Sequence, residues 1–221
     1  MLLKKSLACL ALVVFALHGG TRAQSNQDKK ESLSDTVDKI FAQWDKPDSP
    51  GCELAVIKDG QIVYKRGYGM ANLEHNIPMS PSSIMDTGSV SKQFTAMAVA
   101  LLAEQSKLSL DDDIRKYLPE IPKYETPITI RHLIHHTSGI RDYLTLMSIA
   151  GTRDDDHYVD GEVMNLLARQ KELNFKPGSE FLYSNSGYFL LSQIVKRASG
   201  QTLREFSNEH IFKSGVVGNQ V

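Results

Sequence analysis

The most constraining feature of the sequence is the stretch over residues 87–104, whose apolar spacing predicts a helix. Residues 97–103 are apolar on nearly all sides, a pattern typical of a helix enclosed by the rest of a fold. We therefore expect a buried helix that begins near Ser89. Its apolar residues recur at helical spacing, at Phe94, Met97, Ala98, Leu101 and Leu102.

Ser89 and Lys92 lie at the start of this predicted helix. Residues three apart share a helical face, so the serine hydroxyl and the lysine ammonium can meet. The free N–H groups of a first helical turn favour a developing alkoxide, and a lysine held there can act on the serine. Serine is also favoured as a simple helix cap, and Ser-x-x-Lys tetrads occur by chance. The pair therefore indicates either a nucleophile with its activator or an ordinary helix start.

A second candidate element is the tripeptide Tyr183-Ser184-Asn185, in a turn before another predicted helix. A nearby ammonium such as that of Lys92 would lower the pKa of the Tyr183 phenol, which could then take the proton from Ser89. Asn185 offers a donor and an acceptor to a substrate amide. The tripeptide alone is common in loops, so only its combination with the serine helix indicates a catalytic site.

With these two motifs in this order, the chain resembles the serine β-lactamase-related family, closest to the group of class C β-lactamases, DD-carboxypeptidases and esterases. The resemblance covers about residues 32–214. It implies an α/β plus all-α lobe, the β-lactamase/transpeptidase-like fold, with the site between the lobes. Further stretches similar to the family lie at 108–112, 116–119, 135–140 and 177–185.

The resemblance implies a secreted serine hydrolase that acts through an acyl-enzyme on β-lactam, D-amino-acid peptide or ester substrates. It assigns Ser89 as nucleophile, Lys92 as activator, Tyr183 as proton shuttle and Asn185 as a substrate contact, with no cofactor. The alternative is a non-catalytic truncated chain or pseudoenzyme that binds cell-wall peptides. The motifs do not distinguish lactam, peptide and ester substrates, and they do not indicate an oligomeric state.

The family's third motif, Lys-Thr-Gly or His-x-Gly, lies on a strand well beyond the second. The candidate here, Lys213-Ser214-Gly215, directly follows a predicted helix and has no strand pattern before it. We interpret it as a chance match. We therefore expect an incomplete domain that lacks the C-terminal part of the sheet and one donor of the oxyanion hole, the other donor being the Ser89 N–H.

The first 23 residues have the pattern of a secretory signal peptide: lysines at the start, an apolar run over 7–17, and small residues before the expected cleavage site. Cleavage after Ala23 removes three basic and no acidic residues, which moves the formal net charge from −1 to −4. This charge argues against nucleic-acid or anionic-membrane partners. Only Cys52 then remains, so no internal disulfide can form. We predict an exported, periplasmic or extracellular protein with one domain over 24–221 and no membrane span after cleavage.

Two clusters invite a metal-site interpretation. The first comprises His132, His135 and His136, which have no carboxylate at the spacing of a His-Glu-x-x-His helix. The second is the acidic run 111–113, which lacks the alternating ligands, glycine and distal glutamate of an EF-hand loop. We therefore predict structural histidines, an aspartate helix cap and no metal.

The remaining signals predict one helix and one hairpin over 32–88, and mainly helices over 89–221. Two β-rich runs joined by Asp59-Gly60 predict the hairpin, and 72–88 is predicted to be irregular. Ser32 can cap a helix whose predicted buried stripe is Leu33, Val37, Ile40, Phe41 and Trp44. Later helix caps or stops are predicted at Thr129, Gly139, Asp160, Gly200 and Thr202.

Overall fold

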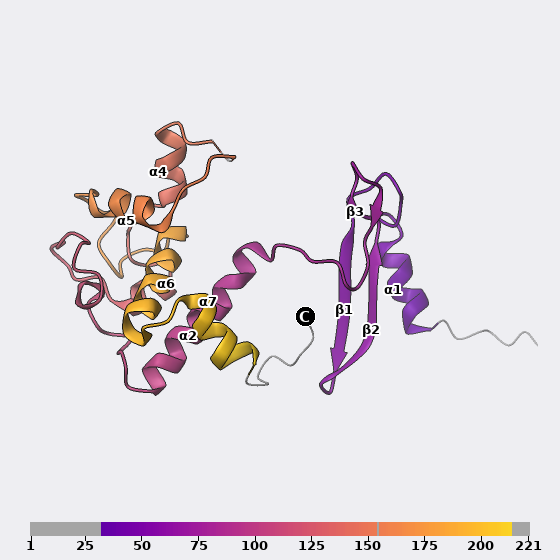
Figure 1. Ribbon diagram of the computed structural model, residues 1–221, viewed down its shortest axis with the longest axis horizontal. Coiled ribbons are helices and arrows are strands. Elements are labelled where there is room, and N and C mark those ends of the chain that lie inside the picture. Colours follow the sequence, from indigo (N-terminus) through magenta and orange to yellow (C-terminus); the bar gives the residue numbers. More distant parts are fainter. Residues whose placement is uncertain (1–31, 154, 214–221) are drawn as a thin grey trace, which may run out of the picture. The chain divides into compact units, whose positions relative to one another are not determined.

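The computed structural model describes residues 32–153 and 155–213. The described chain forms two compact units that divide between Met85 and Asp86 (Figure 1). The predicted signal peptide lies outside the described residues. No helix in the described part is long and apolar enough to cross a bilayer.

The first unit contains one helix and two antiparallel strand pairs. Its main sheet pairs β1 with β2, joined by Asp59 and Gly60 at φ values of 50° and 73°, as a two-residue hairpin turn requires. The predicted helix and hairpin are therefore confirmed. The elements are α1 Leu33–Phe41, β1 Cys52–Lys58, β2 Gln61–Tyr68, β3 Met70–Asn72 and β4 Ile77–Pro78.

Helix α1 packs on β2 through a mixed aromatic and ionic contact. The Phe41 ring stacks on Tyr68 with centroids 4.9 Å apart, and Asp38 accepts a hydrogen bond of 2.7 Å from the Tyr68 hydroxyl. Arg66 on β2 pairs with the same carboxylate at 2.7 Å. These contacts fix one side of the helix against the hairpin (Figure 1).

Two predictions for the first unit were wrong. Ile40 and Trp44, expected in the buried stripe of the helix, are 61% and 41% exposed. The contact with β2 is made through Asp38 and Phe41 and leaves Ile40 uncovered. Trp44 lies beyond the end of α1 at Phe41, so it is not on the helix face at all. The segment 72–88, expected to be irregular, begins with the short β3–β4 pair, in which Pro78 ends a strand and needs no ladder N–H.

The second unit is helical, as predicted. Helix caps form at Thr129 and Thr202, both with the reciprocal bonds of a capping box, and Gly200 ends α6 at φ 80°. The elements are η1 Gly88–Ser91, α2 Lys92–Glu104, η2 Ile114–Lys116, α3 Ile130–Ile134, α4 Tyr143–Ile149, α5 Asp160–Ala168, α6 Asn185–Ser199, α7 Leu203–Ser207 and the π-helical turn η3 Asn208–Phe212.

The structure differs from the predictions at three helix ends in this unit. Asp160 was predicted as a helix cap, but it is the first residue of α5, which follows the N-cap residue Val159. The first turn at Ser89 is a 3₁₀ turn, η1, and the α-helix begins only at Lys92. Helix α3 ends at Ile134 and not near Gly139, because His136 already adopts a left-handed φ of 57°. The differences at η1 and α3 affect residues of the candidate site.

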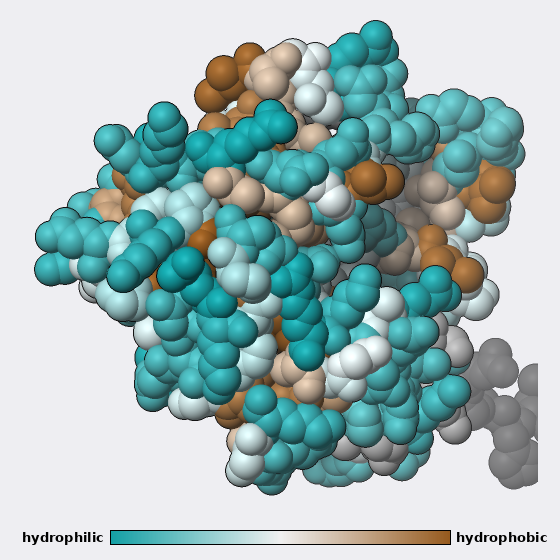
Figure 2. Space-filling view, turned by 60° about the vertical axis from the view of Figure 1, so that its left-hand side comes forward, coloured by the Kyte–Doolittle hydropathy of each residue, from teal (hydrophilic) through white to brown (hydrophobic). Residues whose placement is uncertain are grey.

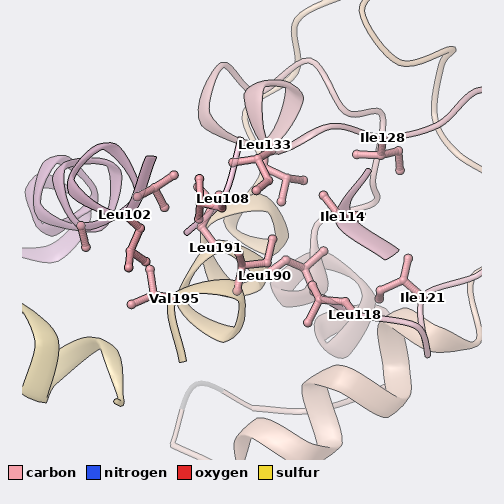
Figure 3. Packing of buried hydrophobic residues seen from close by; sticks show 14 of the residues in the cluster. Leu102, Leu108, Ile114, Leu118, Ile121, Ile128, Leu133, Leu190, Leu191 and Val195 are labelled. Carbon is pink, nitrogen blue, oxygen red and sulfur yellow. The ribbon is translucent and has the colours of Figure 1, made fainter. Parts of the chain in front are cut away.

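The core of the second unit is centred on α6, which packs against α2, α3 and α7. Aliphatic side chains from α2, α3 and α6 and from the segment 108–128 point toward one another (Figure 3). Gly187 on α6 allows close approach, since a Cβ there would lie 3.2 Å from the Leu133 carbonyl oxygen. Each fully buried leucine contributes roughly 2 kcal/mol, so this cluster dominates the unit's stability.

Helix α2 was predicted to be buried on all sides, and this prediction is wrong. Ala98, Val99 and Leu102 are fully buried, but Met97 is 37% exposed. The buried residues face α6 and α7, and Met97 lies on another face of the helix. Hydrophilic residues cover most of the molecular face in Figure 2, with hydrophobic residues scattered among them.

Candidate active site

The turn that carries Ser89 is shaped by the residues just before it. Gly88 adopts a φ of 51°, which favours glycine, and its N–H donates to Asp86 Oδ1 at 2.8 Å. The Ser91 hydroxyl donates back to the Gly88 carbonyl at 2.6 Å. These local bonds place Ser89 in η1, one short turn ahead of α2, with its side chain exposed.

The structure brings the four predicted site residues together. Ser89 Oγ lies 3.0 Å from Lys92 Nζ and 2.8 Å from the Tyr183 hydroxyl. Lys92 also donates to Asn185 Oδ1 at 3.0 Å, and the Tyr183 hydroxyl lies 3.5 Å from the same oxygen. Two segments more than 90 residues apart in the sequence thus form one hydrogen-bonded group of serine, lysine, tyrosine and asparagine.

The electrostatics of the group make the Tyr183 phenol easier to ionise than a free tyrosine. Hydrogen bonds with Lys92 and then Ser89, together with the lysine charge, hold the pKa of the Tyr183 phenol below its usual range, although burial acts in the opposite direction. The Lys92 ammonium also lies 5.1 Å from the centre of the Tyr183 ring. Tyr183 is 44% exposed, so its hydroxyl is open to a molecule approaching from solvent.

Asp142 supports this group and was missed by the sequence analysis. One carboxylate oxygen accepts from the Asn185 N–H at the start of α6, and the other accepts from the Thr145 N–H at 3.2 Å. One aspartate therefore caps both α4 and α6. Its place before an apolar run is a typical N-cap signal, but the bond to α6 joins residues 43 positions apart, which the sequence does not reveal.

Ser186 links the same two segments from the side of α6. Its hydroxyl donates to the Arg141 carbonyl at 2.7 Å and accepts from the Tyr143 N–H at 2.8 Å. Its side chain is fully buried. Together with Asp142 it fixes the end of the Tyr183-Ser184-Asn185 tripeptide to the start of α4.

His136 also contacts the tripeptide. Its Nδ1 accepts a hydrogen bond of 3.2 Å from the Ser184 N–H, and its ring centre lies 4.5 Å from that of Tyr183. His136 therefore has a structural hydrogen bond, and the absence of a metal at the histidines stays a prediction. The described residues contain no group of three or more histidine, cysteine, aspartate or glutamate side chains placed to hold a metal ion.

The candidate third motif cannot be placed in this arrangement. Lys213 follows η3, whereas Ser214 and Gly215 lie outside the described residues. The interpretation of Lys213-Ser214-Gly215 as a chance match therefore stays a prediction.

Comparison with known proteins gives the family. The profile of the β-lactamase family matches residues 36–218, which is most of the chain. The chain belongs to the β-lactamase family. This also confirms the predicted β-lactamase/transpeptidase-like fold.

Several β-lactamase-family relatives are similar in sequence or structure. A D-aminopeptidase from Brucella anthropi is 36% identical over 74% of this chain and 31% of its own length. Penicillin-binding protein 4* from Bacillus subtilis is 32% identical over 84% of this chain and 40% of its own length. The solved structure of EstCE1, a hydrolase with promiscuous acyltransferase activity, has a TM-score of 0.72 and 28% identity over 82% of this chain and 51% of its own.

The chain thus spans 31% to 51% of the length of these three relatives. Its nucleophile segment, Ser89 to Lys92, and its Tyr183 to Asn185 segment both lie inside the matched range 36–218.

Proposed function

We propose that this chain carries the nucleophile centre of a serine hydrolase that works through an acyl-enzyme. The observation that carries the proposal is the position of Ser89 Oγ, within hydrogen-bond distance of both Lys92 Nζ and the Tyr183 hydroxyl. A serine becomes a nucleophile when an adjacent group can take its proton. Here the ionised Tyr183 hydroxyl can take it, and the Lys92 ammonium donates to the same serine oxygen.

The geometry supports a definite division of labour. The Tyr183 phenolate accepts the Ser89 proton as Oγ attacks a carbonyl carbon, and the phenol then donates that proton to the departing nitrogen or oxygen. Lys92 lowers the pKa of Tyr183, which makes the phenolate easier to reach, and it orients Ser89 through its own hydrogen bond. In the second step Tyr183 takes a proton from water as the water oxygen attacks the serine ester. Tyr183 then gives that proton to Ser89 Oγ as the acid product leaves, which restores the free Ser89 hydroxyl.

Asn185 is proposed as the substrate contact. Its Oδ1 already accepts from Lys92, so its NH₂ group remains as the donor for a substrate carbonyl. The same bond fixes the side chain beside the nucleophile, where a substrate amide must lie for attack. We place the developing oxyanion near the Ser89 N–H, at the first turn before α2.

The relatives favour amides, peptides or esters of D-amino acids as the substrate class, with β-lactams as further acylating agents. This proposal rests on a D-aminopeptidase, a penicillin-binding protein and an acyl-transferring hydrolase among the similar proteins. Export also remains a proposal, supported by the lysine-led apolar run that precedes Ala23.

The test is a substrate panel with matched variants. The chain would be assayed with p-nitroanilides of D- and L-alanine, a p-nitrophenyl ester and nitrocefin. Turnover should require Ser89, so Ser89→Ala should abolish it, whereas Ser148→Ala, which changes an exposed serine on α4, should leave it unchanged. Turnover that survives Ser89→Ala would contradict the proposal. Binding of a D-alanyl-D-alanine peptide without Ser89-dependent turnover would favour the non-catalytic alternative.

A further inference from the structure

We propose that His136 is a positioning residue that sets the Tyr183 phenol against Ser89 and Lys92, an inference that rests on the proposed function of the same site. In the part of the chain that the structure describes, His136 makes no hydrogen bond to Ser89 or to the Tyr183 oxygen, and its ring lies against the Tyr183 ring, so its effect would act through Tyr183. Its role would therefore be to orient a catalytic residue.

The first support is that His136 holds the chain on both sides of Tyr183. Its carbonyl oxygen accepts from the Leu182 N–H at 2.9 Å, and its Nδ1 accepts from the Ser184 N–H at 3.2 Å. Its ring also lies against the Tyr183 ring, with centroids 4.5 Å apart and planes inclined by 32°. One residue thus fixes the backbone before Tyr183, the backbone after it and the ring itself.

The second support is that the imidazole is itself held in place. The rings of Tyr188 and Phe181 lie 5.2 Å and 5.9 Å from it, so aromatic side chains contact it on several sides. Its backbone has a left-handed φ of 57°, a conformation that histidine and asparagine adopt more readily than most residues. An imidazole fixed in this way can orient its neighbour.

The contact requires a neutral ring, because Nδ1 must lack a proton to accept from Ser184. The titratable groups around it are Lys92 from α2, Tyr183 and Tyr188 from the segment that contains α6, and His135 beside it. Burial and then the Lys92 charge lower the pKa of His136 below its usual range, which favours the neutral form at pH 7. Protonation would place two N–H donors face to face, and the bond to Ser184 would be lost.

Two variants separate the acceptor from the ring. His136→Phe keeps an aromatic ring but removes the acceptor, whereas His136→Asn keeps an acceptor oxygen, tolerates the left-handed φ and does not titrate. The main readout is the pKa of Tyr183, followed by NMR of ¹³Cζ-labelled tyrosine and assigned with Tyr183→Phe. This readout does not depend on turnover.

We expect the Tyr183 pKa to rise toward its usual value near 10 in His136→Phe and to stay close to wild type in His136→Asn. The kcat for the ester should fall roughly 10- to 100-fold in His136→Phe with little change in KM, because small displacements of a catalytic group have effects of this size. In His136→Asn the fall in kcat should stay below about tenfold. In the wild type, protonation of His136 at low pH should lower kcat, and this decrease should be absent in His136→Asn.

An unchanged Tyr183 pKa in His136→Phe would overturn the proposal, as would an equal shift in both variants. If neither variant folds, the wild-type Ser184 amide proton decides, since its chemical shift should follow the titration of His136 below pH 6.5. A chemical shift of the Ser184 amide proton that does not change as His136 titrates would overturn the proposal. A wild-type chain that shows these shifts but no Ser89-dependent turnover would support the role of His136 and refute the proposed function.

Discussion

Replacement of Asp142 tests how the site is held, because this one carboxylate caps two helices. Asp142→Ala removes the acceptors for the Asn185 N–H of α6 and the Thr145 N–H of α4. Loss of one N-cap costs about 1 kcal/mol of stability, and a hydrogen bond to a charged group contributes about 1.5–3 kcal/mol. Asp142 is partly exposed, so two lost caps should lower the free energy of unfolding by about 2–4 kcal/mol.

The measurement is urea denaturation followed by far-UV circular dichroism, with Asp113→Ala as the matched control. Asp113 caps only η2, through one bond of 2.8 Å from the Arg115 N–H, so its loss should cost about 1 kcal/mol. Asp142→Asn keeps one acceptor oxygen and should fall between the two. If Asp142→Ala costs no more than Asp113→Ala, the double-capping argument is wrong.

Three further predictions concern the site. Lys92→Ala and Tyr183→Phe should each slow Ser89-dependent turnover by about 10²- to 10⁴-fold in steady-state assays, and a change below tenfold would contradict their roles. The kcat/KM of the wild type should rise with pH and level off above the pKa of Tyr183, which lies below 10, because the phenolate is the form that accepts the proton. Lys92→Ala should move this rise to higher pH, and a pH profile that does not move would contradict the prediction. The buried Ser184 hydroxyl finds no hydrogen-bond partner in the part of the chain that the structure describes. Ser184→Ala should therefore leave the free energy of unfolding unchanged or raise it by about 1 kcal/mol in thermal denaturation, and a clear fall in that free energy would contradict the prediction.

Much of the local structure could be predicted because its causes are local. Ser32 caps α1 as expected, Thr202 forms the expected capping box, and Asp59-Gly60 forms the expected hairpin turn. The spacing of Ser89 and Lys92 places both on one helical face, and their contact follows from it. Exposure could not be predicted equally well, since Ile40 fits an apolar stripe but no neighbouring element covers it.

The parts of the site that the sequence did not reveal depend on contacts between distant segments. Asp142 and His136 lie 43 and 48 positions from their partners at Asn185 and Ser184. Each also has an ordinary local explanation, as a helix cap and as a structural histidine. Only the packing of α3 and α4 on α6 brings them to the tripeptide.

The central claim is that Ser89 is an activated nucleophile, and covalent labelling tests it most directly. The chain would be treated with a fluorophosphonate, which phosphonylates an activated serine, or with a fluorescent penicillin, which acylates it. Intact mass and peptide mapping would then locate the adduct.

We expect one adduct on the peptide that contains Ser89, no adduct in Ser89→Ala, and slow labelling in Lys92→Ala. The exposed Ser148 should stay unmodified in all three proteins. An adduct that persists undiminished in Ser89→Ala, or one that maps to another serine, would contradict the account.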